Sequence, residues 1–289
     1  MDIALVTDEL SADPQTALEL ATEWGIRHVE LRGYFTDRVP LLSAYQRQRL
    51  RRLVAAHGVT VTAISPGLFK IPYPAETPPT SNLGWMDHSF HQQWADSRAA
   101  LDHHLRELLP ASIDFALEFG AAFIVAFSFH RAGGPGGPAP RPVVEALAAA
   151  AEKVHAAGLT LLIETEEGFW ADTGARSAAL VRAVGHPALA INWDPANSLC
   201  EGDRPYPDGY THVRTLVRNV HFKDARRFAD GRCAFVADGE VDWQGQIRAL
   251  IADGYRGCIT LEPHLEPMLP AMRKALERLR ALIAGARNS

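Results

Sequence analysis

The run Leu189-Ala190-Ile191-Asn192-Trp193-Asp194-Pro195-Ala196-Asn197 is a short apolar segment that ends in a carboxylate and is stopped by a proline. Because proline has no backbone N–H and does not continue a strand interior, the run predicts a buried strand with Asp194 at its carboxyl end. One such aspartate carries little information. The same arrangement recurs at 159–164, which ends in Glu164, at 219–224, which contains His221, and at 258–263, which contains Glu262.

Short runs rich in Val, Ile, Leu and Phe alternate with longer segments of helical periodicity, which is typical of βα units and a parallel sheet. The predicted strands are 2–7, 28–32, 60–65, 122–128, 159–164, 189–194, 219–223 and 258–262. Helical patterns lie near 14–24, 41–57, 99–119, 142–157, 174–184, 210–218, 242–253 and 267–284. Eight βα units in 289 residues predict an α/β fold, a TIM (β/α)8 barrel that forms a single domain over residues 1–289.

An open doubly wound sheet is the alternative architecture. Such a sheet usually carries G-x-G-x-x-G after its first strand, whereas this chain has Thr7-Asp8-Glu9-Leu10-Ser11 there. The segment 66–98 is longer than most connections and carries Trp85 and His88 among other aromatic residues. Long βα loops in barrels often act as lids, so we expect this loop to be a lid or a subunit contact.

Composition and charge narrow the functional classes. The formal net charge is -5, whereas nucleic-acid binders usually carry a basic face, so a nucleic-acid partner is disfavoured. The three cysteines are an odd number without C-x-x-C spacing, which argues against a disulfide framework or a thiolate zinc site. No signal peptide pattern and no run of about 18 apolar residues is found, so we expect a cytoplasmic protein without a membrane partner.

Four side chains share one position on consecutive predicted strands. In a barrel every strand points its carboxyl end at the same face, so Glu164, Asp194, His221 and Glu262 are expected to meet there. Three carboxylates and one imidazole form a ligand set that suits Mg²⁺, Mn²⁺ or Co²⁺ and can hold Zn²⁺. Without a cation, three adjacent carboxylates would repel one another. The pattern therefore predicts one divalent metal site.

Other polar residues are weaker candidates for the same pocket. Lys223 shares the inward face with the histidine ligand, and it either presents a fixed positive charge to a substrate oxygen or pairs with a ligand carboxylate. Arg227 either donates two hydrogen bonds from its guanidinium to substrate oxygens or is a solvated loop residue. Glu30 and Arg32, at the end of the second strand, and Glu9, after the first, are candidates for the pocket floor.

These motifs together resemble the xylose isomerase-like barrel superfamily of sugar isomerases and epimerases. That superfamily includes ketose 3-epimerases, hydroxypyruvate isomerase, inosose dehydratase and, more distantly, the endonuclease IV repair enzymes. The matching stretches are Val29-Glu30-Leu31-Arg32, Ile163-Glu164, Asp194-Pro195-Ala196-Asn197, His221-Phe222-Lys223-Asp224, Gly239-Glu240-Val241-Asp242-Trp243 and Leu261-Glu262. They cover nearly the whole chain, and their order and spacing are specific to the superfamily but not to one activity.

The resemblance implies a metal-dependent isomerase or epimerase of a small sugar or polyhydroxy ketone, in carbohydrate metabolism. One divalent ion, Mn²⁺, Mg²⁺, Co²⁺ or Zn²⁺, would be held by Glu164, Asp194, His221 and Glu262 and would stabilise an enediolate. Glu164 and Glu262 would act as the catalytic acid/base pair from opposite sides of the substrate. A dehydratase, in which the enediolate expels a β-hydroxyl, is the alternative. Relatives are commonly dimers or tetramers, so the resemblance also implies a homo-oligomer.

Departures from the family pattern indicate a different substrate from that of the ketose 3-epimerases. Those enzymes have a histidine where this chain has Asn197 and a glutamate where it has Trp170, and both of their residues contact the sugar. We therefore expect Asn197 and Trp170 to contact the substrate, and Arg227 matches the family's substrate arginine. The missing histidine at Asn197 also argues against the endonuclease IV branch. A non-catalytic sugar-binding barrel remains open.

Overall fold

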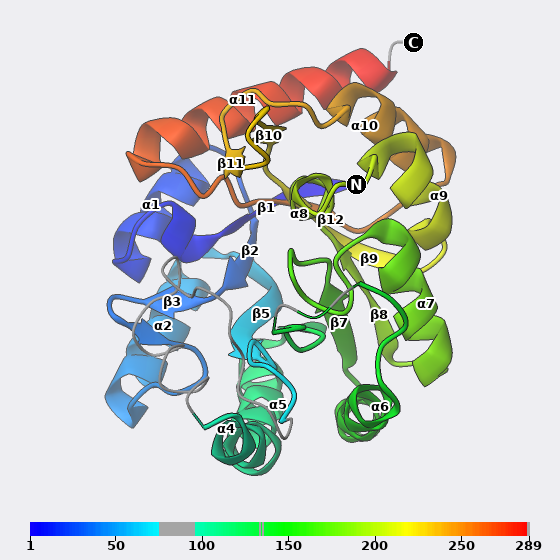
Figure 1. Ribbon diagram of the computed structural model, residues 1–289. Coiled ribbons are helices and arrows are strands. Elements are labelled where there is room, and N and C mark those ends of the chain that lie inside the picture. The colour runs from blue at the N-terminus through cyan, green and yellow to red at the C-terminus, as the bar shows by residue number, and fades with distance from the viewer. Residues whose placement is uncertain (75–95, 133, 135, 288–289) are drawn as a thin grey trace.

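The computed structural model describes residues 1–74, 96–132, 134 and 136–287 (Figure 1). Within these residues, eight parallel strands close into a barrel in the order β1-β12-β9-β8-β7-β6-β5-β2. The barrel strands are β1 (Asp2–Val6), β2 (His28–Leu31), β5 (Thr60–Leu68), β6 (Phe123–Ala126), β7 (Thr160–Glu164), β8 (Leu189–Trp193), β9 (Val217–Phe222) and β12 (Cys258–Leu261). Each predicted run forms one of them, so the predicted TIM barrel is confirmed.

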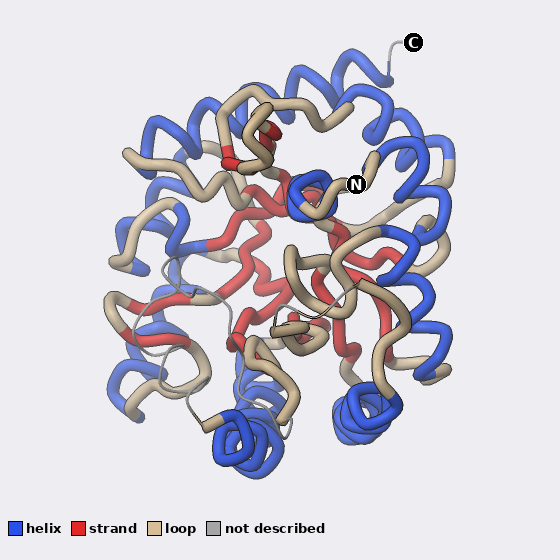
Figure 2. Tube along the Cα trace, in the orientation of Figure 1, coloured by secondary structure: helices blue, strands red, loops and turns tan. Residues whose placement is uncertain are grey.

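Helices surround the barrel, with the strands at the centre (Figure 2). They are α1 (Pro14–Glu23), α2 (Ala44–His57), α4 (Ser97–His103), α5 (Leu109–Phe119), α6 (Arg141–Ala156), α7 (Gly174–Val184), α9 (Tyr210–Val213), α10 (Trp243–Ala252) and α11 (Met268–Arg287). A π-helical turn at His104–Leu108 joins α4 to α5. The boundaries of α2 have local causes: Ser43 and Gln46 form a capping box, and Gly58 ends the helix at φ 58°.

The apolar core lies between the strands and the helices. Leu18 of α1, Leu50 of α2, Phe115 of α5 and Leu147 of α6 are fully or almost fully buried against the outside of the barrel. Burying an aliphatic or aromatic side chain of this size contributes about 1.5–3 kcal/mol, so these contacts fix the helices to the sheet. None of the helices in the described ranges is long and apolar enough to cross a membrane.

A network of polar side chains lies in the interior of the barrel. Thr260 donates a hydrogen bond to Asn219 at 3.0 Å, and Asn219 donates to Asn192 at 3.0 Å. All three side chains are buried and come from neighbouring strands β12, β9 and β8. A buried polar network of this kind is stable only when its members satisfy one another, and it holds the ends of the strands in register for the residues above it.

Several elements were not predicted from the sequence. Pro195 begins a short helix, α8 (Pro195–Cys200), whose first turn is capped by Asp194. Two hairpins, β3 (Gly33–Tyr34) with β4 (Asp37–Arg38) and β10 (Ala225–Arg227) with β11 (Cys233–Phe235), lie outside the barrel sheet. The lid or subunit contact expected at 66–98 falls mostly on residues 75–95, which lie outside the described residues.

A disulfide joins Cys200 to Cys233, so the prediction that the cysteines form no disulfide was wrong. Cys200 ends α8 and Cys233 begins β11, and the hairpin folds back against the helix until the two Cα atoms are 5.3 Å apart. Cys258 is unpaired. The two bonded residues are 33 positions apart, and only the tertiary fold makes them neighbours.

Reduction of this disulfide is expected to make the hairpin turn more sensitive to trypsin. Arg226, Arg227 and Arg232 are exposed there, and the disulfide is the covalent link between the hairpin and α8. A cross-link that closes a loop of this length stabilises the folded state by about 3–4 kcal/mol in the chain-entropy model. Cleavage can be followed by mass spectrometry with and without a phosphine reductant. Cys258→Ser should behave as wild type, and equal cleavage rates in both redox states would contradict the expectation.

Candidate metal centre

Four potential ligands meet at the carboxyl end of the barrel. Glu164 ends β7, Asp194 directly follows β8, His221 lies in β9, and Glu262 directly follows β12. These strands are neighbours in the order β12-β9-β8-β7, and one ligand atom of each residue lies within 4.8 Å of all the others. All four residues are buried. The structure thus brings together the four side chains that the strand positions predicted.

Two buried atoms of this cluster, Asp194 Oδ2 and His221 Nδ1, form no hydrogen bond of normal geometry with any described residue. Asp194 Oδ2 does lie 2.9 Å from Lys223 Nζ, as an ion pair. Nδ1 lies 3.0 Å from Glu262 Oε2 and 3.3 Å from Glu164 Oε1. Buried polar atoms normally have partners, and an ion among these four groups would supply one. Oxygen ligands with one imidazole fit Mg²⁺, Mn²⁺, Co²⁺ or Zn²⁺.

Burial and mutual charge give the carboxylates different acidities. Burial raises the pKa of Glu164, and the charge of Glu262 adds to the effect. Burial also raises the pKa of Asp194. At Glu262, burial acts in the same direction, but Lys223 and His221 outweigh it and hold the pKa well below its ordinary value. Glu262 is thus the most firmly ionised of the three carboxylates.

Glu30 lies behind His221 rather than in a substrate pocket. Its Oε2 is 3.2 Å from His221 Nε2, and its Oε1 accepts a hydrogen bond from Ser65 at 2.5 Å. Glu30 has no exposed surface, so its position does not fit the predicted substrate contact. When the Nε2–H group donates a hydrogen bond to this carboxylate, the ring is oriented with Nδ1 facing the other three side chains of the cluster, as is common for metal-binding histidines.

A cavity of about 690 Å³ adjoins the cluster. Its lining includes Lys70, His130, Glu166, Asn197, Lys223 and Phe235. Two of the predicted substrate residues, Asn197 and Lys223, therefore face it. The Asn197 amide donates to Glu166 Oε2 at 2.7 Å. Lys223 connects the cavity to the four-residue cluster, because its Nζ lies 2.9 Å from Asp194 Oδ2 and 3.1 Å from Glu262 Oε2.

Arg227 and Trp170 lie elsewhere. Arg227 is exposed on the β10–β11 hairpin, and Trp170 packs partly buried against the hydrophobic core. Neither is among the described residues that line the cavity, so their contact with a substrate stays a prediction. Arg227 lies on this hairpin because the chain turns directly after β9.

Sequence reasoning missed several charged residues of the site. Lys70 pairs with Glu166 at 2.8 Å across the cavity. The only signal for Glu166 was its place two residues after Glu164, and no local pattern distinguished Lys70. His264 Nδ1 lies 2.7 Å from Glu9 Oε1.

Glu9, Glu262 and His264 form a second group with metal-ligand spacing. Arg32 donates hydrogen bonds to Glu9 at 2.5 Å and to Glu262 at 2.8 Å, so its guanidinium already offsets the negative charge of these two carboxylates. Glu9 and Arg32, the weaker floor candidates, thus lie beside the site. The pairing favours the first cluster as the metal centre.

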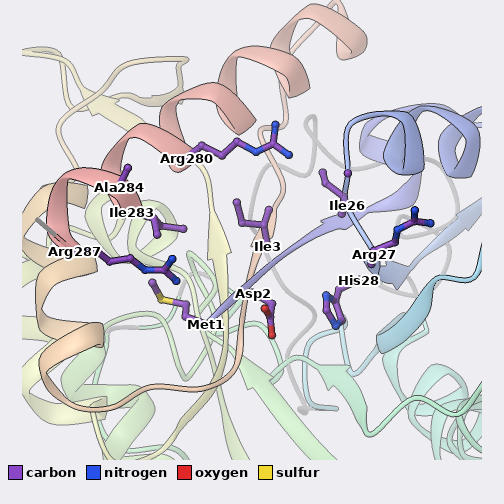
Figure 3. Close-up of a pocket in the computed structure, with 11 residues that line it drawn as sticks. Met1, Asp2, Ile3, Ile26, Arg27, His28, Arg280, Ile283, Ala284 and Arg287 are labelled. Carbon is purple, nitrogen blue, oxygen red and sulfur yellow. The ribbon is translucent and has the colours of Figure 1, made fainter.

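A second cavity, of about 510 Å³, lies at the opposite end of the barrel (Figure 3). It is bounded by α11 and by the amino-terminal ends of β1 and β2, and Arg27, Arg280 and Arg287 line it. Within the described residues, no group with metal-ligand spacing lines this cavity. Active sites of TIM barrels lie at the carboxyl ends of the strands, which places the chemistry at the other cavity.

Comparisons with known proteins support this assignment of the fold. Among curated proteins, none matches the sequence. The structure of L-ribulose 3-epimerase is 21% identical, with a TM-score of 0.69 over 100% of this chain and 96% of the other. The probable 3-DHS dehydratase AsbF from Bacillus anthracis is 17% identical, with a TM-score of 0.69 over 97% and 99%. A xylose isomerase-like TIM barrel protein from Mycobacterium smegmatis, in complex with magnesium, is 18% identical, with a TM-score of 0.64 over 99% and 97%.

The sequence itself carries the family assignment. Residues 18–282 match the sequence model of the xylose isomerase-like TIM barrel family, which is most of the chain and includes all four ligands of the cluster. The solved structures of low identity agree with the fold but do not distinguish one activity from another. The chain therefore belongs to the xylose isomerase-like TIM barrel family.

Proposed function

We propose that the protein is a divalent-metal-dependent isomerase or epimerase of a small sugar or polyhydroxy ketone. The observation that carries the proposal is the buried cluster of Glu164, Asp194, His221 and Glu262 beside a cavity of about 690 Å³. A cavity of that size accommodates a small ligand, and its polar lining offers hydrogen bonds to several hydroxyl groups. The names of the similar structures, an epimerase and a dehydratase, support enzymatic chemistry of this kind.

A divalent ion held by these four side chains would supply a Lewis acid that polarises a carbonyl and balances the negative charge of the deprotonated substrate. Side chains of the protein would bind the substrate and transfer the proton. Asn197 and Glu166 would bind substrate hydroxyls from the cavity wall, and Glu164 would accept the proton from the carbon next to the carbonyl. Glu262 would return the proton from the opposite side in an epimerase.

The surroundings of the two glutamates differ, and this favours a second candidate, a dehydratase. Glu262 Oε1 accepts from Arg32 at 2.8 Å and its Oε2 accepts from Lys223 at 3.1 Å, so both oxygens are engaged. Among the described residues, His221 is the one that forms an ion pair with Glu164. An epimerase needs a second group that returns a proton to the intermediate. A dehydratase does not, because its intermediate expels a hydroxyl group instead, so Glu164 alone would be enough. Lys223 faces the cavity and could donate a hydrogen bond to that leaving group.

The test is a screen of ketoses, inososes and oxidised glycosides with the Mn²⁺-loaded protein in D₂O. Incorporation of deuterium at one carbon, with the carbon skeleton and the oxygen content unchanged, is expected for an isomerase or epimerase. Loss of one water from the substrate would establish the dehydratase instead. If the metal-loaded protein neither exchanges nor converts any member of these classes, the proposed enzymatic function is wrong.

A further inference from the structure

Lys223 lies between the cavity and the metal-ligand cluster. Its ammonium nitrogen is 2.9 Å from Asp194 Oδ2 and 3.1 Å from Glu262 Oε2, and its side chain is 1% exposed. The nitrogen also lies 4.8 Å from the centre of the Phe235 ring, which lines the cavity. The ammonium is thus enclosed by two ligand carboxylates and by an aromatic face that attracts cations.

The charges of the cluster explain why a lysine is buried there. Glu164, Asp194 and Glu262 bring three negative charges when ionised, and the ammonium of Lys223 offsets one of them. Among the four side chains of the cluster, the remaining two equal the charge of one divalent ion; the buried Glu30 carboxylate lies on the other side of the imidazole, 3.2 Å from His221 Nε2. Arg32 also contacts Glu262, but it bonds to Asp8 and Glu9 as well, so its charge is shared with carboxylates outside the cluster. Buried charges are tolerated when they are paired.

We propose that Lys223 is the resident counter-cation of this centre. It keeps Asp194 and Glu262 paired when no ion is bound, and the divalent ion then binds against the repulsion of its positive charge. The inference rests on the proposed metal site but not on the proposed reaction. Lys223 is accordingly a positioning residue, which lets the barrel stay folded without metal at the expense of metal affinity.

The test is Lys223→Met, which keeps an unbranched side chain one atom shorter and removes its charge. The dissociation constant for Mn²⁺ is measured by titration calorimetry, and thermal unfolding is followed with Mn²⁺ and with a chelator. We expect the variant to bind Mn²⁺ at least about tenfold more tightly, because the repulsion between the ammonium and the ion is gone. Its unfolding temperature should fall with chelator, and the drop should be smaller with Mn²⁺.

Lys70→Met is the matched control. Lys70 lines the same cavity, but its ion pair is with Glu166, outside the four ligands. Its removal should leave the Mn²⁺ affinity within about twofold of wild type, since its ion pair is with Glu166 and not with one of the four cluster carboxylates or the histidine. If Lys70→Met also bound Mn²⁺ about tenfold more tightly than wild type, the proposal would be overturned, because the loss of any positive charge from the pocket would then explain the gain in both variants.

A double variant decides the case if Lys223→Met does not fold without metal. Asp194→Asn combined with Lys223→Met removes one negative and one positive charge together, so it is expected to restore the stability of the metal-free protein. A double variant less stable than, or equal to, the single one would overturn the proposal. So would a Lys223→Met protein with wild-type Mn²⁺ affinity and wild-type stability in chelator.

The outcomes also separate this inference from the proposed reaction. A wild-type protein that binds no Mn²⁺ refutes both. A protein that binds Mn²⁺ and responds to Lys223→Met as expected, but converts no ketose, supports the counter-cation and refutes the reaction. A wild-type protein that converts a ketose, with a Lys223→Met variant that binds Mn²⁺ as tightly as wild type, supports the reaction and refutes the counter-cation.

Discussion

Glu164→Gln is expected to lower kcat by about 10²–10⁴-fold, the usual contribution of a general base. The amide occupies the same space, but it cannot accept a proton from the substrate. It also remains a weak oxygen ligand, so the other three ligands should retain part of the metal affinity. The measurement is the rate of deuterium exchange into the substrate, together with the Mn²⁺ content of each protein.

Two further variants make this result specific. Glu277→Gln alters an exposed glutamate of α11 and should leave the exchange rate unchanged. Glu262→Gln should retain exchange of the first proton and lose product formation if the two glutamates act in sequence. Should Glu164→Gln stay within about threefold of the wild-type exchange rate, Glu164 is not the base, since that difference is far below a base's contribution.

His221→Ala is expected to abolish metal binding and to destabilise the protein. It removes the nitrogen of the cluster and, within the described residues, leaves Glu30 Oε2 with only a long hydrogen bond, 3.4 Å, from Asn219. An unsatisfied buried polar group costs about 1–3 kcal/mol, and a charged one costs more. Titration calorimetry with Mn²⁺ and urea unfolding measure the two effects separately.

Glu30→Gln separates ligand loss from ligand orientation. The glutamine oxygen still accepts a hydrogen bond from His221 Nε2, but without the negative charge, so the metal affinity should fall only about 10–100-fold. His155→Ala alters an exposed histidine of α6 and serves as the control. Wild-type Mn²⁺ affinity in His221→Ala would show that the ion binds elsewhere, and the cluster would then have no role in metal binding.

The barrel and its ligand cluster followed from repeated local patterns. Eight apolar runs of strand length, separated by helical segments, were enough to predict the strand order, because parallel βα units close in chain order. Glu164, Asp194, His221 and Glu262 each lie at the end of such a run, so equal positions on neighbouring strands predicted that they would meet. The structure brings them within 4.8 Å of one another.

The residues around the cluster could not be assigned in the same way. Arg227 and Trp170 were selected by their distance along the chain from a ligand, and both lie away from the cavity. Loops follow no fixed period, so a distance in sequence does not give a direction in space. Lys70, which does line the cavity, stands in a loop with no pattern around it.

The barrel and the positions of the four candidate ligands could be predicted from the sequence, because strand periodicity and the shared direction of parallel strands are local properties that repeat. Three contacts required the three-dimensional structure: Glu30 lies against His221 from 191 residues away, Lys223 pairs with Asp194 and Glu262, and Cys200 bonds to Cys233. These contacts depend on side-chain directions and loop paths, which are set by packing across the whole molecule rather than by neighbours in the chain.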